Sequence, residues 1–483
     1  MATRFLSDLF ILILLNLIIK PFWVFGIDRT VQNTVGTEVY GSYFALFNLS
    51  LLFNIVLEMG VNQFNNRAIA QNNEKLKSYL PNLLSLKVLL SILYTIILII
   101  VAIILGYNGG QLHILILLIV NQIIISYLLF VRSNISGLQQ FRIDSFLSIT
   151  DKLCMILICA VLLWFAPFKN HFNITWFVWA QIFGNGIALA IAFSIIKKLA
   201  GSLKWQTNCF AIKNLLYKAL PYALLGFLMT IYFRIDGLML ERLLGDNGAS
   251  QNGIYAAGFR LLDAVIMIAF LFASILMPLF SKLLAEKEKV ADLLHFSGRL
   301  LVCISVIVAL SIWPFAQQIM DLLYTDSDAQ YGNILKILMF TFIPVSIVYV
   351  YGTLLAANGS MRLLNWVAFI AVILNVSLNF IFIAKWQAIG AAYATLITQL
   401  LVAFIYIVIA HKIIDNEINW KEVFLMSLFF ACSLIAAIIA NSIQQNWFAY
   451  FCVLVAFMLV LSFLFNILKV NEFKKWAGIK QST

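Results

Sequence analysis

Charged residues are scarce in this chain: they make up 11% of its 483 residues, whereas 63% are hydrophobic. Soluble domains are typically about 25% charged and about 45–50% apolar. A soluble fold needs a polar exterior, and this composition does not supply one. The composition therefore excludes an ordinary soluble protein and indicates a chain whose solvent is lipid.

Other absences exclude further classes of function. The six cysteines show no CxxC spacing and the four histidines are scattered, so we assign no disulfide, metal site or catalytic residue. No P-loop is present, because the stretch from Gly245 to Gly253 lacks a following Lys-Ser/Thr, and this argues against ATP as the energy source. The loops are short, and we interpret the acidic Asp326-Ser-Asp328 as solvated. We therefore expect no enzyme and no cofactor, although a coupling H⁺ or Na⁺ is compatible with the sequence.

Long apolar runs, by contrast, fill most of the sequence. Because a bilayer core of about 30 Å needs about 20 apolar residues per helix, the pattern predicts an all-α polytopic membrane protein with about 14 transmembrane helices. The predicted spans are 5–26, 41–64, 82–105, 112–135, 146–166, 174–197, 215–240, 253–280, 299–320, 333–356, 363–384, 388–411, 422–440 and 447–468.

The net charge of +11 follows from the membrane topology. Most of the 32 lysines and arginines, Lys87 among them, fall on the side of the N-terminus. The positive-inside rule then places both termini in the cytoplasm, and it removes the need for a nucleic-acid partner. The outer loops hold only four basic residues, together with acidic ones such as Asp28 and Glu241, and the remaining four basic residues fall inside spans. The four in outer loops are Arg29, Lys169, Arg242 and Lys385.

An internal repeat divides the chain. Gly41-Ser-Tyr-Phe-Ala matches Gly253-Ile-Tyr-Ala-Ala, and a Glu-Lys pair follows each glycine after 33 residues. We predict two six-helix lobes in parallel orientation, 1–205 and 206–413, followed by two extra transmembrane helices in 414–483. Two homologous lobes are the usual architecture for alternating access, with the substrate site between them.

Ionisable residues at membrane depth cost about 2.5–3.5 kcal/mol on insertion scales, so they mark candidate sites. Lys20, Arg234 and Arg260 lie at similar predicted depth, and Asp236 and Asp263 are close to the arginines in sequence. In the functional interpretation, the three cations bind a pyrophosphate in a wet cavity, and the carboxylates hold the arginines or bind a coupling ion. In the alternative, Lys20 snorkels and the other residues form structural ion pairs.

Polar residues also recur every four positions in the predicted span 41–64, on one face of the helix. They are Ser50, Asn54, Glu58, Asn62 and Asn66. Lipid does not tolerate such a face, so we expect it to point inward. Asn54, Glu58 and Asn62 then either line a path for sugars or form hydrogen bonds between helices, and we favour the path for Glu58.

Several segments resemble those of a known family. Val35–Tyr43, Arg234–Leu240 and Ala388–Thr395 are similar to segments of bacterial polysaccharide-unit (O-antigen) flippases, which share a superfamily with MATE exporters and lipid II flippases. The resemblance implies transport of an undecaprenyl-pyrophosphate-linked oligosaccharide from the cytoplasmic to the periplasmic leaflet of the inner membrane. It further implies a role in cell-surface polysaccharide (lipopolysaccharide) biosynthesis, with the lipid bilayer and polysaccharide-assembly proteins as partners.

Two other functions stay open at this point. A MATE-like cation-coupled drug exporter has the same architecture, but it favours acidic rather than basic residues in its cavity. A membrane glycan polymerase or ligase acts on the same glycolipids, but by catalysis. Such an enzyme would show catalytic turnover of purified glycolipid in detergent, which a flippase does not.

Overall fold

The structure is a computed structural model that describes residues 19, 21–62, 65–66, 69, 75–138, 140–200, 209–288, 290–414, 419–442 and 446–468. These residues form helices and connecting turns, and no strand occurs among them. The chain forms two compact units, Met1–Ala256 and Ala257–Thr483. The boundary between them falls inside one long helix, α12 (Gly248–Ala285).

The predicted fold class is confirmed. Within the described ranges, eleven helices are long and apolar enough to cross a membrane. One of them, α16 (Met361–Ile414), contains two predicted spans and is interrupted at Gln387, whose φ of 52° and ψ of −130° are not helical. Of the remaining predicted spans, 5–26 lies largely outside the described residues and 41–64 is broken. The lobe boundaries at 205 and 413 stay a prediction.

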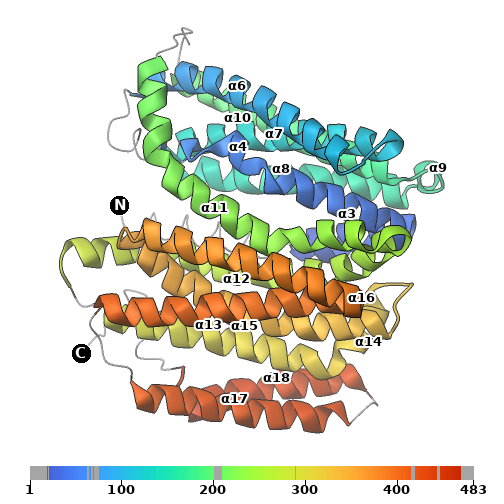
Figure 1. The fold of residues 1–483 in the computed structure, drawn as a ribbon, viewed down its shortest axis with the longest axis vertical. Helices are drawn as coiled ribbons and strands as arrows, with labels where there is room; N and C mark the ends of the chain where they lie inside the picture. Colours follow the sequence, from blue (N-terminus) through green and yellow to red (C-terminus); the bar gives the residue numbers. More distant parts are fainter. Residues whose placement is uncertain are drawn as a thin grey trace. The chain divides into compact units, whose positions relative to one another are not determined.

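The first unit is built mainly from long helices that pack on one another. In Figure 1, α6, α7, α8 and α10 run side by side, and α11 packs against α3. Leu83, Leu128 and Ala192 belong to the buried apolar cluster that joins α6, α7 and α10. The elements are a π-helix at Trp23–Asp28, α2 (Arg29–Val35), α3 (Thr37–Leu52), α4 (Asn54–Glu58), α6 (Lys75–Ile104), α7 (Gly109–Gly137), α8 (Phe141–Trp164), α9 (Ala166–Lys169), α10 (Ile174–Ala200), α11 (Cys209–Leu243) and the 3₁₀ turn η2 (Gly245–Asn247).

In the second unit, α13 packs against α15, α17 and α18, and α15 packs against α16. The pair α17 and α18 lies side by side in Figure 1, and Phe429 and Met458 of this pair are buried in one cluster with Leu310. Asp328 caps the first turn of α15 by accepting hydrogen bonds from two backbone N–H groups. The helices are α13 (Ala291–Ile312), α14 (Ala316–Leu323), α15 (Ala329–Ala357), α16, α17 (Trp420–Asn441) and α18 (Trp447–Leu464), with the 3₁₀ turn η3 at Trp313–Phe315.

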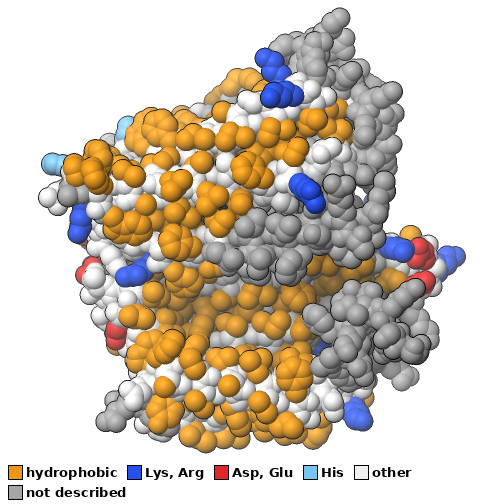
Figure 2. Space-filling view, turned by 180° about the vertical axis from the view of Figure 1, so that it is seen from behind, with side chains coloured by type: hydrophobic (Ala, Val, Ile, Leu, Met, Phe, Trp, Pro, Cys, Tyr) orange, Lys and Arg blue, Asp and Glu red, His pale blue; other side chains and the backbone are white. Residues whose placement is uncertain are grey.

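The outer surface of the helices is apolar. One face of α6 exposes Leu89, Ile92, Ile96, Ile100 and Ile103, which recur at helical spacing. Figure 2 shows hydrophobic side chains covering most of the described surface on its face, with few charged side chains between them. Water-soluble proteins rarely expose apolar surface on this scale. The protein is therefore a multi-span membrane protein whose helices face lipid.

Candidate functional site

The predicted second span is broken in the structure. α4 ends at Glu58, and Met59 and Gly60 follow with φ values of 37° and 72°. Two successive residues with positive φ do not continue a right-handed helix. Asn54 therefore lies before the break and Asn62 after it, so the polar residues do not form the continuous stripe that the sequence predicted. Non-helical backbone at membrane depth is tolerated where protein groups or a wet cavity satisfy it.

The side chain of Lys87, in α6, donates hydrogen bonds to groups next to this break. Its side chain is fully buried, and its ammonium donates to the Leu57 carbonyl at 3.1 Å, to the Ser126 carbonyl at 3.2 Å and to the Ser126 hydroxyl at 2.6 Å. An ammonium has three donors, and these three acceptors use all of them. Lys87 was counted among the basic residues on the side of the N-terminus, and in the structure it is buried inside the candidate span Leu80–Ile104. Since α6 already begins at Lys75, Lys87 lies roughly 18 Å further along the helix axis.

Glu58 provides the opposite charge. Its carboxylate and the Lys87 ammonium attract each other, and Glu58 is half-buried whereas Lys87 is fully buried. A buried ammonium without such partners costs several kcal/mol, so the pair makes the charge tolerable at this depth. Past the break, the Asn62 side-chain oxygen is buried and has no hydrogen-bond partner. The broken helix therefore brings Glu58 near the hydrogen-bonded ammonium of Lys87, and it leaves the Asn62 oxygen able to accept a hydrogen bond.

A chain of buried amides runs through the same unit. Gln181 donates to the Tyr43 hydroxyl at 2.9 Å, Asn121 donates to Gln181 at 3.3 Å, and Asn185 donates to Asn121 at 2.8 Å. These residues come from α3, α7 and α10, and all are buried. None of these residues was among the predicted site residues, although amides inside the apolar runs 112–135 and 174–197 are the sequence signal that could have identified them. The network joins three helices by hydrogen bonds in a region without bulk water.

Two buried carboxylates are each held by a tyrosine. Tyr40 donates to Asp28 at 2.6 Å, and Tyr255 donates to Asp236 at 2.6 Å. Both aspartates are almost inaccessible. The prediction that Asp28 lies in an outer loop was therefore wrong, because the Tyr40 hydroxyl makes its burial possible. In each case the tyrosine belongs to a helix that carries the repeated glycine, Gly41 in α3 or Gly253 in α12.

The predicted cations fall into different parts of the structure. Lys20 lies outside the described residues. Arg234 is half-buried on α11, with its guanidinium carbon 5.8 Å from the centroid of the Phe233 ring. Arg260 belongs to the second unit, where it pairs with Asp263 at 3.9 Å, one turn further along α12. The expected ion pair between these two residues is present, and the grouping of the three cations stays a prediction.

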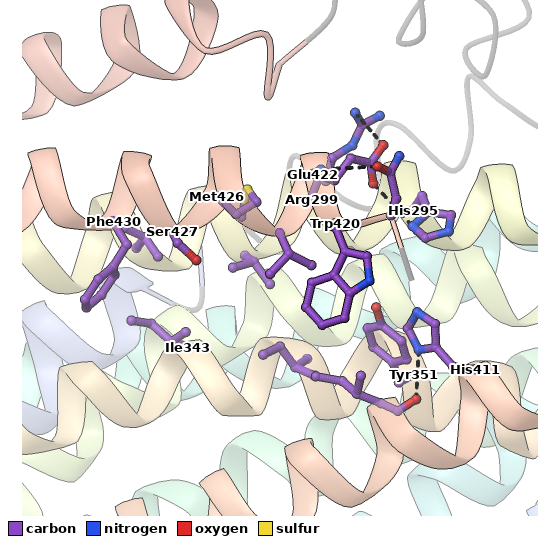
Figure 3. Close-up of a pocket in the computed structure, with 17 residues that line it drawn as sticks. His295, Arg299, Ile343, Tyr351, His411, Trp420, Glu422, Met426, Ser427 and Phe430 are labelled. Carbon is purple, nitrogen blue, oxygen red and sulfur yellow. Dashed lines mark hydrogen bonds and ion pairs between the residues drawn. The ribbon is translucent and has the colours of Figure 1, made fainter. Parts of the chain in front are cut away.

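The second unit contains a separate, mostly apolar pocket of about 580 Å³ between α13, α15, the end of α16 and α17. In Figure 3 its charged residues and its two histidines gather at one end. There, the Glu422 carboxylate forms an ion pair with Arg299 at 3.3 Å and lies 3.3 Å from the His295 ring nitrogen. The His411 ring stacks on Tyr351 nearby, with 6.1 Å between the centroids.

The other end of this pocket is hydrophobic. Ile343, Met426 and Phe430 line it, and Figure 3 shows them away from the ionic end. A cavity with an apolar body and a charged end matches an amphiphile, whose chain and head need different surroundings. No sequence pattern predicted this pocket, because its lining residues come from four different helices, α13, α15, α16 and α17.

Comparisons with known proteins agree with this architecture. Residues 5–284 match the model of a family described as polysaccharide biosynthesis protein, and residues 221–381 match the MatE family model. A comparison with curated proteins gave no match.

Several solved structures share the fold. The lipid II flippase MurJ in an inward closed conformation has a TM-score of 0.69 at 16% identity, covering 98% of this chain and 99% of its own. A MOP superfamily transporter from Pyrococcus furiosus has a TM-score of 0.62 at 14% identity, covering 85% and 95%. A variant of the Vibrio cholerae MATE transporter VcmN has a TM-score of 0.59 at 13% identity, covering 85% and 97%.

Proposed function

The chain belongs to the polysaccharide biosynthesis protein family, and we propose that it is a flippase for lipid-linked oligosaccharides. In this proposal it moves an undecaprenyl-pyrophosphate-linked oligosaccharide from the cytoplasmic to the periplasmic leaflet of a bacterial inner membrane, and both termini are cytoplasmic. The family match over residues 5–284 is the observation that carries the proposal. The fold shared with MurJ supports it. The protein performs no chemical conversion of the substrate.

The basic residues at membrane depth would bind the pyrophosphate. Arg234 and Arg260 suit this role because a guanidinium matches phosphate oxygens in a bidentate manner, and Lys20 would add a third charge. Asp263, 3.9 Å from Arg260, would hold that arginine in place. Asp236, which accepts a hydrogen bond from Tyr255, would take part in binding the coupling H⁺ or Na⁺.

The polar groups at the break in the second span would form hydrogen bonds with the sugars of the substrate. Asn54, Glu58 and Asn62 lie before, at and after the break, where backbone and side-chain polar groups are concentrated. Sugar hydroxyls both donate and accept hydrogen bonds, so amides and a carboxylate are suitable partners. In the proposal, the lobes 1–205 and 206–413 alternate access to this path.

The pocket of the second unit would accommodate lipid. Its apolar body of about 580 Å³ suits part of a polyprenyl chain, and its charged end suits a phosphate-bearing head. The segment 414–483 contributes α17 to this pocket, which gives the first of the two extra helices a role.

Export measurements test the proposal directly. We expect Arg234→Ala and Arg260→Ala to abolish export of surface glycan in cells that depend on this protein, with membrane insertion unchanged. Arg234→Lys and Arg260→Lys should retain part of the activity, because the charge stays while the bidentate geometry is lost. Lys385→Ala, at an exposed residue far along the chain, is the matched control. Normal export in both alanine variants would remove the cationic-site proposal.

A second candidate is a cation-coupled drug exporter, which the match of residues 221–381 to the MatE family model favours. Proteoliposomes discriminate between the two. A flippase translocates a fluorescent undecaprenyl-pyrophosphate glycolipid and leaves ethidium untouched, whereas a drug exporter expels ethidium in response to a proton or sodium gradient. Turnover of glycolipid in detergent would instead indicate a polymerase or ligase.

A further inference from the structure

A polar pocket of about 460 Å³ lies at one end of the first unit. Its walls come from the first turns of α3 and α7, the end of α11 and the turn that leads into α12. None of its lining residues belongs to the helix break or to the amide chain. The charge distribution along the sequence predicts that this end faces outward. The polar lining residues are Glu38, Ser42, Gln111, Glu241, Arg242 and Asp246.

Glu241 is the buried acceptor of this pocket. Only 8% of the residue is exposed, although the sequence placed it in an outer loop. One carboxylate oxygen accepts a hydrogen bond from the Tyr107 hydroxyl, and the other, Oε1, is buried without a hydrogen-bond partner. Burial and then the Glu241 carboxylate raise the pKa of Tyr107, so the phenol keeps its proton and continues to donate.

Arg242 supplies the donors. Its guanidinium carbon lies 3.5 Å from the centroid of the Tyr107 ring, a close cation–π contact. Its Nε is 3.7 Å from the Glu241 carboxylate, which is an ion pair but too long for a hydrogen bond. The Nε and Nη2 atoms are buried and have no hydrogen-bond partner. Since buried donors and acceptors are paired in the great majority of native structures, these atoms point to a polar ligand.

The backbone holds these groups in place. A Cβ atom at Gly248 would lie 2.8 Å from the carbonyl carbon of Glu241 and 2.9 Å from its Cα, closer than real Cβ atoms approach. α12 therefore begins in direct contact with the end of α11, and only glycine permits this approach. The carboxylate and the guanidinium are thus both carried by the end of α11, against which the start of α12 packs.

The mixture of charges decides which ligand fits. A cation would suit Glu38, Glu241 and Asp246, but it would be repelled by Arg242 and leave the free N–H groups of that arginine unpaired. A phosphate would pair with Arg242 but would face the carboxylates. A hydroxyl donates one hydrogen bond and accepts others, so neighbouring hydroxyls of one sugar ring can donate to the Glu241 Oε1 and accept from the Arg242 Nε and Nη2.

We propose that this pocket binds a neutral saccharide through adjacent hydroxyl groups. That the saccharide is the exported one rests on the proposed flippase function; that the pocket takes sugar hydroxyls rests on its own donors and acceptors. On this basis the pocket is a receiving site at the outer end of the first unit, distinct from the path along the broken helix.

Saturation-transfer difference NMR on the full-length protein in nanodiscs tests this proposal. The probes are methyl glycosides of glucose, galactose, rhamnose and N-acetylglucosamine and the disaccharides maltose and lactose, each at millimolar concentration. We expect transfer to the ring protons of at least one probe. Arg242→Gln should weaken its binding by about tenfold, the size expected for losing charge-assisted hydrogen bonds. Lys385→Gln, at an exposed residue outside the pocket, should leave binding unchanged.

A second variant separates binding from folding. Gln111→Ala removes a lining side chain and leaves the contacts between Tyr107, Glu241 and Arg242 intact. It should weaken saccharide binding without lowering the melting temperature. No transfer to any probe, or equal binding by wild type and Arg242→Gln, overturns the proposal. Stabilisation by sodium chloride over choline chloride that disappears in Glu241→Gln also overturns it, in favour of a cation site.

Failure of the flippase proposal has a different signature. Arg234→Ala and Arg260→Ala would then export glycan normally, while saccharide binding at the pocket would be unaffected. Conversely, loss of export in these two variants with no saccharide binding in the wild type would leave the flippase in place and remove the outer receiving site.

Discussion

Gly41 and Gly253, which occupy equivalent positions in the sequence repeat, meet in direct backbone contact. A Cβ atom on Gly41 would lie 2.6 Å from the backbone nitrogen of Gly253. Two side chains reinforce the crossing, since Asn252 donates to the Gly41 carbonyl at 2.7 Å and Gln32 donates to the Gly253 carbonyl at 3.1 Å. Helices in membranes approach this closely where glycine leaves no side chain between them. The repeat thus places its glycines where α3 and α12 cross.

The crossing should therefore be intolerant of any side chain. We expect Gly41→Val to destabilise the first unit by about 1–3 kcal/mol, the usual cost of overpacking, and to lower the melting temperature of the detergent-solubilised protein. Gly226→Val is the matched control, because a Cβ atom at Gly226 meets nothing within 4 Å. Equal melting temperatures for the two variants would contradict the crossing.

The buried ammonium of Lys87 gives a second prediction. Lys87→Met removes the ammonium that donates to the Leu57 carbonyl and the Ser126 hydroxyl and that lies near Glu58, so we expect a loss of about 1.5–3 kcal/mol, as for other hydrogen bonds to charged groups. Chemical denaturation followed by tryptophan fluorescence measures this loss.

The companion variant Glu58→Gln tests whether the two charges act together. The double variant Lys87→Met/Glu58→Gln should be less destabilised than the sum of the two single variants, because neither charge is then left alone. Strict additivity would show that Lys87 serves the backbone break alone and not Glu58.

The sequence was a good guide to the spans and a poor guide to what happens inside them. Lipid forces every crossing segment to be apolar for about 20 residues, so hydropathy finds the segments. It does not find the break after Glu58, because hydropathy reports how apolar a segment is and not the backbone dihedral angles of Met59 and Gly60. The partner that makes the break tolerable, Lys87, is 30 residues away from Leu57 in the chain.

The same reason explains which side-chain contacts could be predicted from the sequence. Arg260 and Asp263 are three positions apart on one helix, so their ion pair was predictable from spacing alone. Asp28 and Glu241 were assigned to loops because a charge near the end of a span is usually solvated. Their burial depends on Tyr40 and Tyr107, which are 12 and 134 positions away, and no local pattern contains that information.

The pocket of the second unit gives a third prediction. Ile343→Trp places a larger side chain in the apolar body of the pocket, so less room remains for an alkyl chain. We expect native mass spectrometry to show reduced binding of undecaprenyl phosphate, with the protein still folded. Ile435→Trp, on an exposed part of α17, is the matched control and should bind as the wild type does. Undiminished binding by Ile343→Trp would place the lipid elsewhere.

Tyr107 gives a prediction for alkaline pH. Its pKa is raised above the ordinary value of 10.0, first by burial and then by the Glu241 carboxylate. The folded state therefore holds the phenolic proton more tightly than the unfolded state does. The resulting stability is fully present below about pH 10 and is lost as the pH rises further, because the unfolded chain then ionises first.

The melting temperature of the wild type should consequently fall more steeply above about pH 10 than that of Tyr107→Phe, which lacks the ionisable group. At neutral pH the wild type should have the higher melting temperature, because the phenylalanine variant has lost the hydrogen bond to Glu241. Scanning fluorimetry across the alkaline range measures both effects, and Tyr450→Phe, at an exposed tyrosine of α18, controls for the general effect of removing a phenol. Parallel curves for the wild type and Tyr107→Phe would show that the contact between Tyr107 and Glu241 does not contribute to folding. In that case the hydrogen bond from Tyr107 would not be what holds the Glu241 carboxylate in position in the polar pocket of the first unit.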